Sequence, residues 1–275
     1  MYLLLENKID EMIELYNNRY SYQKIADKYN CSKSHVMKLL NGKVISRNNH
    51  EKGKTKECDE NYFDCIDSED KAYWLGFIFG DGFIYDEKPG EHSGILCISL
   101  SSEDEEHLYK FKDAISSSHI IHTYDNSKGY SNGKLSRIKI NSNHMVNSLK
   151  KYGMIANKTN IIGEPKNINE EFHIPFVRGF FDADGSIMLW EDKGSMYWAV
   201  SFCKTPQLLN FVERILSYKW IWSQRKDSNN QCMTITLNKK IETVDFLNKL
   251  YANASIYLDR KYERYLEVIN ELQII

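Results

Sequence analysis

A duplicated motif constrains the fold of this chain more than any other feature of its sequence. WLGFIFGDG (Trp74–Gly82) and VRGFFDADG (Val177–Gly185) align without a gap, and both end in Asp-Gly. Self-similarity of this kind indicates a structural unit that occurs twice. The chain is therefore expected to contain two similar halves that are related by a pseudo-twofold axis.

A pair of lysines supports the duplication independently. Lys158 lies as far beyond Asp81 as Lys261 lies beyond Asp184, and each lysine follows a short apolar stretch. A single Asp-Gly pair is more simply explained as the end of a helix. Because the chain has two such pairs in matching register, each with a lysine at the same distance, helix termination alone is a weaker explanation for either pair.

The segments between these landmarks repeat a coarse pattern of helix, two strands, helix, two strands and helix. Period-two alternation with turn residues between the strands indicates an antiparallel sheet in each half. We therefore predict an α+β fold, a tandem αββαββα arrangement preceded by a small all-α domain. The predicted boundaries are 1–42 for the all-α domain, 43–68 for a linker, 69–165 for the first repeat and 166–275 for the second.

The amino-terminal segment indicates a helix-turn-helix. Helical spacing predicts helices at about 6–17, 22–29 and 33–40, with Ser21 and Ser32 as caps of the last two. In such units the last helix enters the DNA major groove. A plain three-helix cap with solvated lysines is the alternative. The predicted DNA contacts on the last helix are Lys33, Ser34, His35 and Lys38.

The charge distribution matters more than its sum. The formal net charge is −2, which taken alone argues against a nucleic-acid partner. The charges nevertheless alternate in bands: 1–56 is basic, 57–107 strongly acidic and 108–163 basic. Basic bands can steer a polyanion even when the total is near zero, although such bands also arise on ordinary solvated surfaces.

Composition excludes several other classes. No apolar run reaches the length of a membrane span, so no membrane partner is expected. The cysteines never form a CxxC pair, which argues against a zinc finger and against a small disulfide-rich scaffold. We expect an intracellular, cytoplasmic protein.

The repeated motif predicts a metal site. Its helices are apolar nearly all round and carry small residues four apart, so the two helices can pack closely on each other. Asp81 and Asp184 would then lie side by side at helix carboxyl ends, where the helix dipole is negative. A divalent cation relieves both repulsions, and oxygen ligands favour Mg²⁺ (or Mn²⁺) over zinc. An EF-hand is excluded because the glycine of Asp182–Gly185 stands at the wrong position for a calcium loop.

These two motifs resemble those of single-chain LAGLIDADG homing endonucleases. The resemblance runs from Ala72 to the end of the chain and includes ASIYLDRKYERY (Ala254–Tyr265). It implies that Asp81 and Asp184 bind the catalytic metals, and that Lys158 and Lys261 belong to the active centre. It also implies a saddle-shaped surface that binds a long DNA site, cleavage of both strands across the minor groove with 3′ overhangs, and an appended helix-turn-helix.

The sequence departs from the family pattern at two places. Phe79 stands where the family often has an earlier aspartate, whereas the second motif keeps Asp182. Arg178 replaces a small apolar residue, and we expect it to reach outward to a phosphate.

Residues that alternate along the strands are the candidates for base recognition. We expect the following to face one side of the sheets: Ser99, Ser101, Arg137, Lys139, Ser201, Lys204, Arg225 and Thr236.

The favoured function is a Mg²⁺-dependent, site-specific double-strand DNA endonuclease of an intron or phage mobile element. The chain should act as a monomer, because the duplication supplies the pseudo-twofold partner. The sequence also allows two alternatives: a DNA-binding regulator without catalysis, and an intron maturase whose partner is the host intron RNA.

Overall fold

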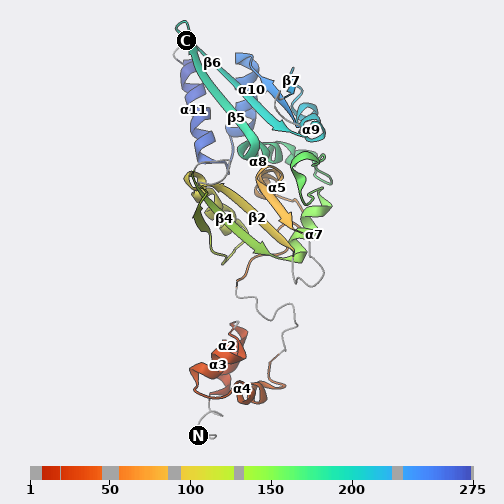
Figure 1. Ribbon diagram of the computed structural model, residues 1–275. Helices are drawn as coiled ribbons and strands as arrows, with labels where there is room; N and C mark the ends of the chain where they lie inside the picture. Colours follow the sequence, from red (N-terminus) through yellow and green to blue (C-terminus); the bar gives the residue numbers. More distant parts are fainter. Residues whose placement is uncertain are drawn as a thin grey trace. The chain divides into compact units, whose positions relative to one another are not determined.

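The computed structural model describes residues 8–18, 20–44, 56–85, 94–126, 133–224 and 232–273. The chain forms two compact units, residues 1–57 and 58–275 (Figure 1). The two repeats predicted from the sequence therefore pack together in one unit. No helix in the described part of the chain combines the length and apolar character that a membrane span requires.

The amino-terminal unit contains three short helices: α2 (Ile9–Asn17), α3 (Tyr22–Lys28) and α4 (Lys33–Leu40). Ser21 and Ser32 cap α3 and α4 as predicted, since their hydroxyls accept hydrogen bonds of 3.2 Å from the Lys24 and His35 amides. This unit has its own small apolar core, which the three helices enclose: Met12, Tyr16, Ile25, Ala26, Val36 and Leu40.

The first half of the second unit follows the predicted order of elements. Its elements are α5 (Glu69–Gly80), β1 (Gly82–Tyr85), β2 (Ile95–Ser101), η1 (Ser102–Asp104), α6 (Glu105–Ala114), β3 (His122–Asp125), β4 (Lys134–Asn141), α7 (Asn143–Lys151) and η2 (Lys158–Asn160).

The second half repeats this order and adds a last helix. Its elements are η3 (Glu170–Phe172), α8 (His173–Asp184), β5 (Gly185–Asp192), β6 (Ser195–Lys204), α9 (Pro206–Leu216), β7 (Ile221–Gln224), β8 (Met233–Leu237), α10 (Lys240–Tyr251) and α11 (Asp259–Gln273).

Each half contains one four-stranded antiparallel sheet, with strand order β1-β2-β4-β3 in the first and β5-β6-β8-β7 in the second. Alternate strand residues are buried against the helices, as Trp198, Val200 and Phe202 are in β6. Their neighbours along the strand point to the other face. We call this second face, in each sheet, the open face.

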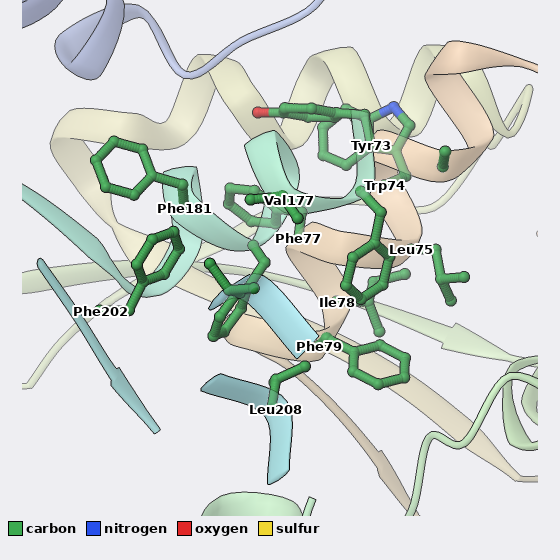
Figure 2. Close-up of a cluster of buried hydrophobic side chains, with 14 of the residues drawn as sticks. Tyr73, Trp74, Leu75, Phe77, Ile78, Phe79, Val177, Phe181, Phe202 and Leu208 are labelled. Atoms are coloured by element: carbon green, nitrogen blue, oxygen red, sulfur yellow. The ribbon is translucent and has the colours of Figure 1, made fainter. Parts of the chain in front are cut away.

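Helices α5 and α8 pack against each other between the two sheets (Figure 1). A side chain at Gly76 would collide with the carbonyl oxygen of Phe176, and one at Gly179 with the carbonyl oxygen of Tyr73. Both glycines are therefore required for backbone-to-backbone contact. Aromatic and aliphatic side chains from both halves surround this contact and merge into one hydrophobic core (Figure 2).

Gly179→Ala should destabilise the protein strongly. The obstacle is backbone, which cannot rotate away, so we expect the free energy of unfolding to fall by about 2 kcal/mol or more, toward the upper range for overpacked cores. Urea denaturation measures this change. Gly163→Ala is the matched control, because a Cβ there has no atom within 4 Å, and an equal loss in both variants would contradict the account.

Candidate metal-dependent active centre

The two motif aspartates lie at the ends of the packed helices. Asp81 follows the last residue of α5 as its C-cap, and Asp184 is the last residue of α8. A Cβ added at Gly80 would lie 3.2 Å from Oδ2 of Asp184, which shows how close the end of α5 comes to this carboxylate. Burial, followed by the negative charge of Asp184, raises the pKa of Asp81 to about 7.

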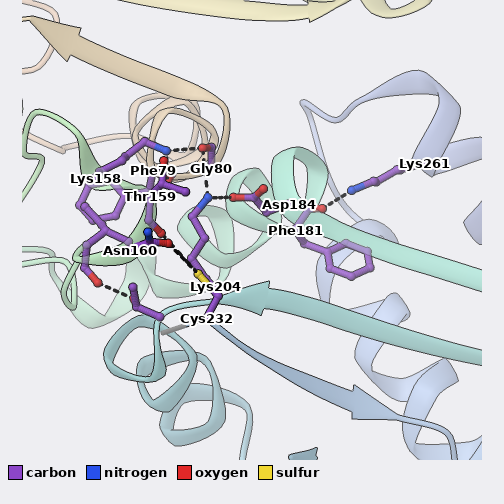
Figure 3. Close-up of polar contacts among 12 residues, drawn as sticks. Phe79, Gly80, Lys158, Thr159, Asn160, Phe181, Asp184, Lys204, Cys232 and Lys261 are labelled. Atoms are coloured by element: carbon purple, nitrogen blue, oxygen red, sulfur yellow. Dashed lines mark hydrogen bonds and ion pairs between the residues drawn. The ribbon is translucent and has the colours of Figure 1, made fainter. Parts of the chain in front are cut away.

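Lys158 and Lys261 occupy equivalent places at the two helix ends (Figure 3). The Lys158 ammonium donates to the carbonyl oxygens of Phe79, at 2.8 Å, and Gly80. The Lys261 ammonium donates to those of Phe181 and, at 2.6 Å, Gly185. Each lysine thus places a cation at the negative end of a helix dipole, next to its own motif aspartate.

Both of these lysines are buried, and burial changes their proton affinity. Desolvation lowers the pKa of Lys158 to about 7 and that of Lys261 to about 8. Nearby Lys204 lowers the pKa of Lys158 further, whereas Asp182 opposes the shift at Lys261. The pKa of Lys158 therefore lies close to neutral pH, where its charged and neutral forms are both populated.

Lys204 is a third lysine in this centre. We predicted that it faces DNA with Ser201, but that facing is wrong: Lys204 continues the buried register of Val200 and Phe202, and it is 8% exposed. Its ammonium forms an ion pair with Asp184 and donates to the Gly80 carbonyl oxygen at 3.4 Å (Figure 3). Lys204 follows Ser201 by three residues, and an odd separation along a strand places two side chains on opposite faces of the sheet. The sequence therefore contained the signal for this facing.

The two halves are not equivalent at this position. Gly82 pairs with Ile98 and Gly185 pairs with Phe202, so Leu100 is the counterpart of Lys204. One half contributes a lysine from its second strand where the other contributes an apolar side chain. The centre therefore holds two carboxylates and three ammonium groups in an asymmetric arrangement.

Asp182 is buried next to the centre and stabilises its surroundings through hydrogen bonds. Its buried carboxylate accepts hydrogen bonds from the hydroxyls of Tyr73, at 2.7 Å, and Tyr251, at 2.5 Å, and from the Leu258 amide, at 2.7 Å. Leu258 immediately precedes α11, the helix that carries Lys261. The earlier motif aspartate thus fixes the segment that positions Lys261, a role that the first motif, with Phe79, lacks.

Arg178 does not reach outward as predicted. It is 3% exposed, donates to the Leu250 carbonyl oxygen at 3.0 Å and forms an ion pair with Glu69. A buried position on α8 leaves it no path to a phosphate. Arg178 instead ties α8 to α5 and to the end of α10.

The donor chemistry of the centre fits a divalent cation. Asp81 and Asp184 supply carboxylate oxygens from two adjacent helix ends, and the raised pKa of Asp81 indicates that its charge is under-neutralised. Oxygen donors of this kind suit Mg²⁺ or Mn²⁺. Within the described residues, no group of three or more His, Cys, Asp or Glu side chains has metal-site geometry, so protein carboxylates alone do not complete a coordination shell.

The open faces of the sheets carry most of the residues predicted for base recognition. Directly paired residues share a face, and the register pairs Ser99 with Arg137 and Ser201 with Thr236. Ser101 and Lys139 lie on the same open face of the first sheet. Arg225 lies outside the described residues. Figure 1 shows both sheets within the same unit.

On the amino-terminal unit, Lys33, Ser34 and Lys38 are exposed on α4, whereas His35 is partly buried. Ser32 begins the helix immediately before them. Their role in DNA binding remains a prediction.

Comparisons with known proteins agree with this architecture. Residues 3–43 match the family model of the helix-turn-helix domain of resolvase, which confirms the predicted helix-turn-helix. No curated protein sequence matches the chain.

Three solved structures are similar to this chain over most of its length. The LAGLIDADG homing endonuclease I-GzeII in complex with its DNA target has a TM-score of 0.54 and 14% identity, over 74% of this chain and 90% of that one. The LAGLIDADG homing endonuclease I-LtrWI bound to target DNA has a TM-score of 0.52 and 10% identity, over 78% and 91%. I-SmaMI bound to uncleaved DNA with calcium ions has a TM-score of 0.51 and 14% identity, over 74% and 90%. The chain thus has the LAGLIDADG homing-endonuclease fold, and the predicted fold class is confirmed.

Asp81→Asn should stabilise the metal-free protein at alkaline pH. The carboxyl has a pKa of about 7 when folded, against an ordinary value of about 4 when unfolded. Between these values the folded state binds more protons, so stability falls as pH rises. The variant avoids this loss. In EDTA its Tm should exceed that of the wild type by a few degrees at about pH 8 but not at about pH 4.

The exposed Asp113→Asn serves as the control for loss of one carboxylate. A Tm below that of the wild type at about pH 8 would mean that the lysines over-neutralise Asp81, and would contradict the assignment of an under-neutralised site.

Proposed function

We propose that this protein is a site-specific double-strand DNA endonuclease of the homing type. One observation carries the proposal: two half-buried carboxylates at equivalent helix ends, Asp81 and Asp184, lie close enough to affect each other and adjoin three buried lysines, Lys158, Lys204 and Lys261. A purely structural packing of α5 against α8 gains nothing from charges of both signs at that point. Phosphodiester hydrolysis uses both.

Asp81 and Asp184 are the residues that would hold a divalent cation, with Mg²⁺ or Mn²⁺ as the expected ions. A divalent cation held there would supply activation of water and stabilisation of the leaving oxygen in phosphodiester hydrolysis. The protein contributes the fixed separation of the carboxylates, because the close contact of α5 and α8 leaves their ends little freedom.

The lysines stabilise charge that develops on a scissile phosphate. Lys158 and Lys261 are held by two carbonyl oxygens each, so their ammonium groups are oriented before DNA arrives. Lys158 can also exchange a proton at Nζ near neutral pH, because its pKa is about 7. Lys204 adds a positive charge next to Asp184.

Duplex DNA is the proposed substrate, contacted by the open faces of the two sheets. The helix-turn-helix unit would add contacts through Lys33, Ser34, His35 and Lys38 on α4. Two repeats in one chain supply both halves of the centre, so we infer a catalytic monomer acting on a long, pseudo-symmetric site in the cytoplasm.

A regulator without catalysis is the main alternative. It would not need the buried acid–lysine centre, and the retention of both aspartates therefore favours an enzyme. An intron maturase would bind RNA, whereas the amino-terminal unit matches a resolvase-type helix-turn-helix, a module for duplex DNA.

Asp81→Asn combined with Asp184→Asn should abolish cleavage but retain binding. The double variant loses the negative charges that would bind the cation, whereas the open faces of the sheets that bind DNA are unchanged. A library of plasmids with randomised inserts, incubated with protein and Mg²⁺, first yields the target; gel shift and plasmid linearisation then measure binding and cleavage. Asp113→Asn should cut normally. Cleavage by the double variant would disprove the proposed centre, and binding without cleavage by the wild type would favour a regulator.

Lys204→Met should lower the cleavage rate rather than the affinity. We expect a loss of about 10²-fold at saturating protein, a usual size for a positioned charge in an active site, with affinity changed little. Lys139→Met, from the open face, should show the converse: weaker binding, a smaller salt dependence and an unchanged rate at saturation. Equal behaviour of the two variants would contradict the placement of Lys204 in the centre.

A further inference from the structure

The open face of the first sheet carries polar groups that its own fold does not satisfy. Within the described residues, the side-chain Nε of Arg137 and the hydroxyls of Ser99 and Tyr124 are buried and have no hydrogen-bond partner. Ser99 pairs directly with Arg137 across β2 and β4, and Tyr124 lies on β3 next to them. Buried polar groups without partners are rare in native proteins, so this cluster keeps hydrogen-bonding capacity that water or a ligand can use.

Arg137 is held in place by aromatic rings. Its guanidinium carbon lies 4.8 Å from the centroid of the Tyr124 ring and 5.9 Å from that of Phe83. Both rings stand on the open face with it. Stacking of this kind fixes the plane of the guanidinium and lowers the entropy that it loses on binding.

The Nε of this guanidinium has no hydrogen-bond partner, acidic or otherwise, among the described residues. On β4, an inner strand of the sheet, it also lies within the open face rather than at its rim. A planar guanidinium on this face can donate two parallel hydrogen bonds to a base edge, a geometry that the ammonium of neighbouring Lys139 lacks.

The second sheet offers an internal comparison. Because Ile138 pairs with Ile98 and Ile235 with Phe202, the counterpart of Arg137 is Thr234. Thr234 is uncharged, and its hydroxyl is not among the buried groups without a partner in the described residues. The two sheets therefore present different chemistry at equivalent places.

We propose that Arg137, oriented by the rings of Tyr124 and Phe83, reads a guanine in the major groove of the half-site bound by the first repeat. Arginine donates two parallel hydrogen bonds to O6 and N7 of guanine, which no other base presents together. The inference rests on the proposed function, because it takes duplex DNA as the ligand. It adds a sequence requirement in one half-site only.

The test uses the full-length protein with Asp81→Asn and Asp184→Asn, so that bound DNA stays intact. Binding selection from a randomised duplex library gives the preferred site. Arg137→Ala and Arg137→Lys are then selected and titrated in the same way. Lys139→Ala and Thr234→Ala are the controls, and thermal melting checks that each variant is folded.

We expect one conserved G·C pair in one half-site. Replacing that guanine with 7-deazaguanine, which lacks N7, should weaken binding by the parent protein about tenfold, equivalent to ~1.4 kcal/mol. Both Arg137 variants should lose the preference at that pair and show no further loss with 7-deazaguanine. Arg137→Lys should retain more affinity than Arg137→Ala because it keeps the charge.

Two results would overturn the inference while leaving the proposed function intact. One is an Arg137→Ala variant that weakens binding to all sequences alike and keeps every base preference, which is the behaviour of a phosphate contact and the result expected for Lys139→Ala. The other is a selected site with no preference for guanine. A protein that enriches no sequence at all would overturn the proposed function and this inference with it.

Discussion

The contact between α5 and α8 is the constraint on which the rest of the structure depends. Gly76 and Gly179 bring each helix against backbone carbonyl groups of the other, closer than any side chain would permit. That contact fuses two repeats into one core, and it fixes the helix ends from which both sheets begin. It also forces Asp81 and Asp184 into one neighbourhood, at an electrostatic cost that ordinary folding would avoid.

The surroundings offset this cost only in part. Lys158 and Lys261 bind the carbonyl oxygens of the helix ends, and Lys204 forms an ion pair with Asp184. Asp81 nevertheless keeps a raised pKa, because burial outweighs the three ammonium groups. A folded state that tolerates an under-neutralised carboxylate is typical of a site built for a ligand rather than for stability.

Sequence reasoning predicted the repeated elements because motif, spacing and strand alternation all recur, and such agreement between levels is what local rules capture well. The expected packing of the two motif helices placed Asp81 and Asp184 side by side, whereas the family resemblance assigned Lys158 and Lys261 to the same region. Two predictions were wrong: Lys204 was grouped with Ser201 on one face of its sheet, and Arg178 was expected to reach outward from its helix. Their burial depends on partners that are distant in sequence, such as Glu69 and Leu250 for Arg178, and no local pattern encodes those contacts.

The central claim, that packing of α5 on α8 couples the two aspartates in one site, can be measured without DNA or metal. Carbon-13 NMR of labelled aspartate gives the pKa of Asp81 in the wild type and in Asp184→Asn. We predict a value of about 7 in the wild type and a lower value in the variant, because the variant removes the neighbouring negative charge and frees Lys204. An ordinary pKa in the wild type, or one that Asp184→Asn leaves unchanged, would show that the two carboxylates do not form one site.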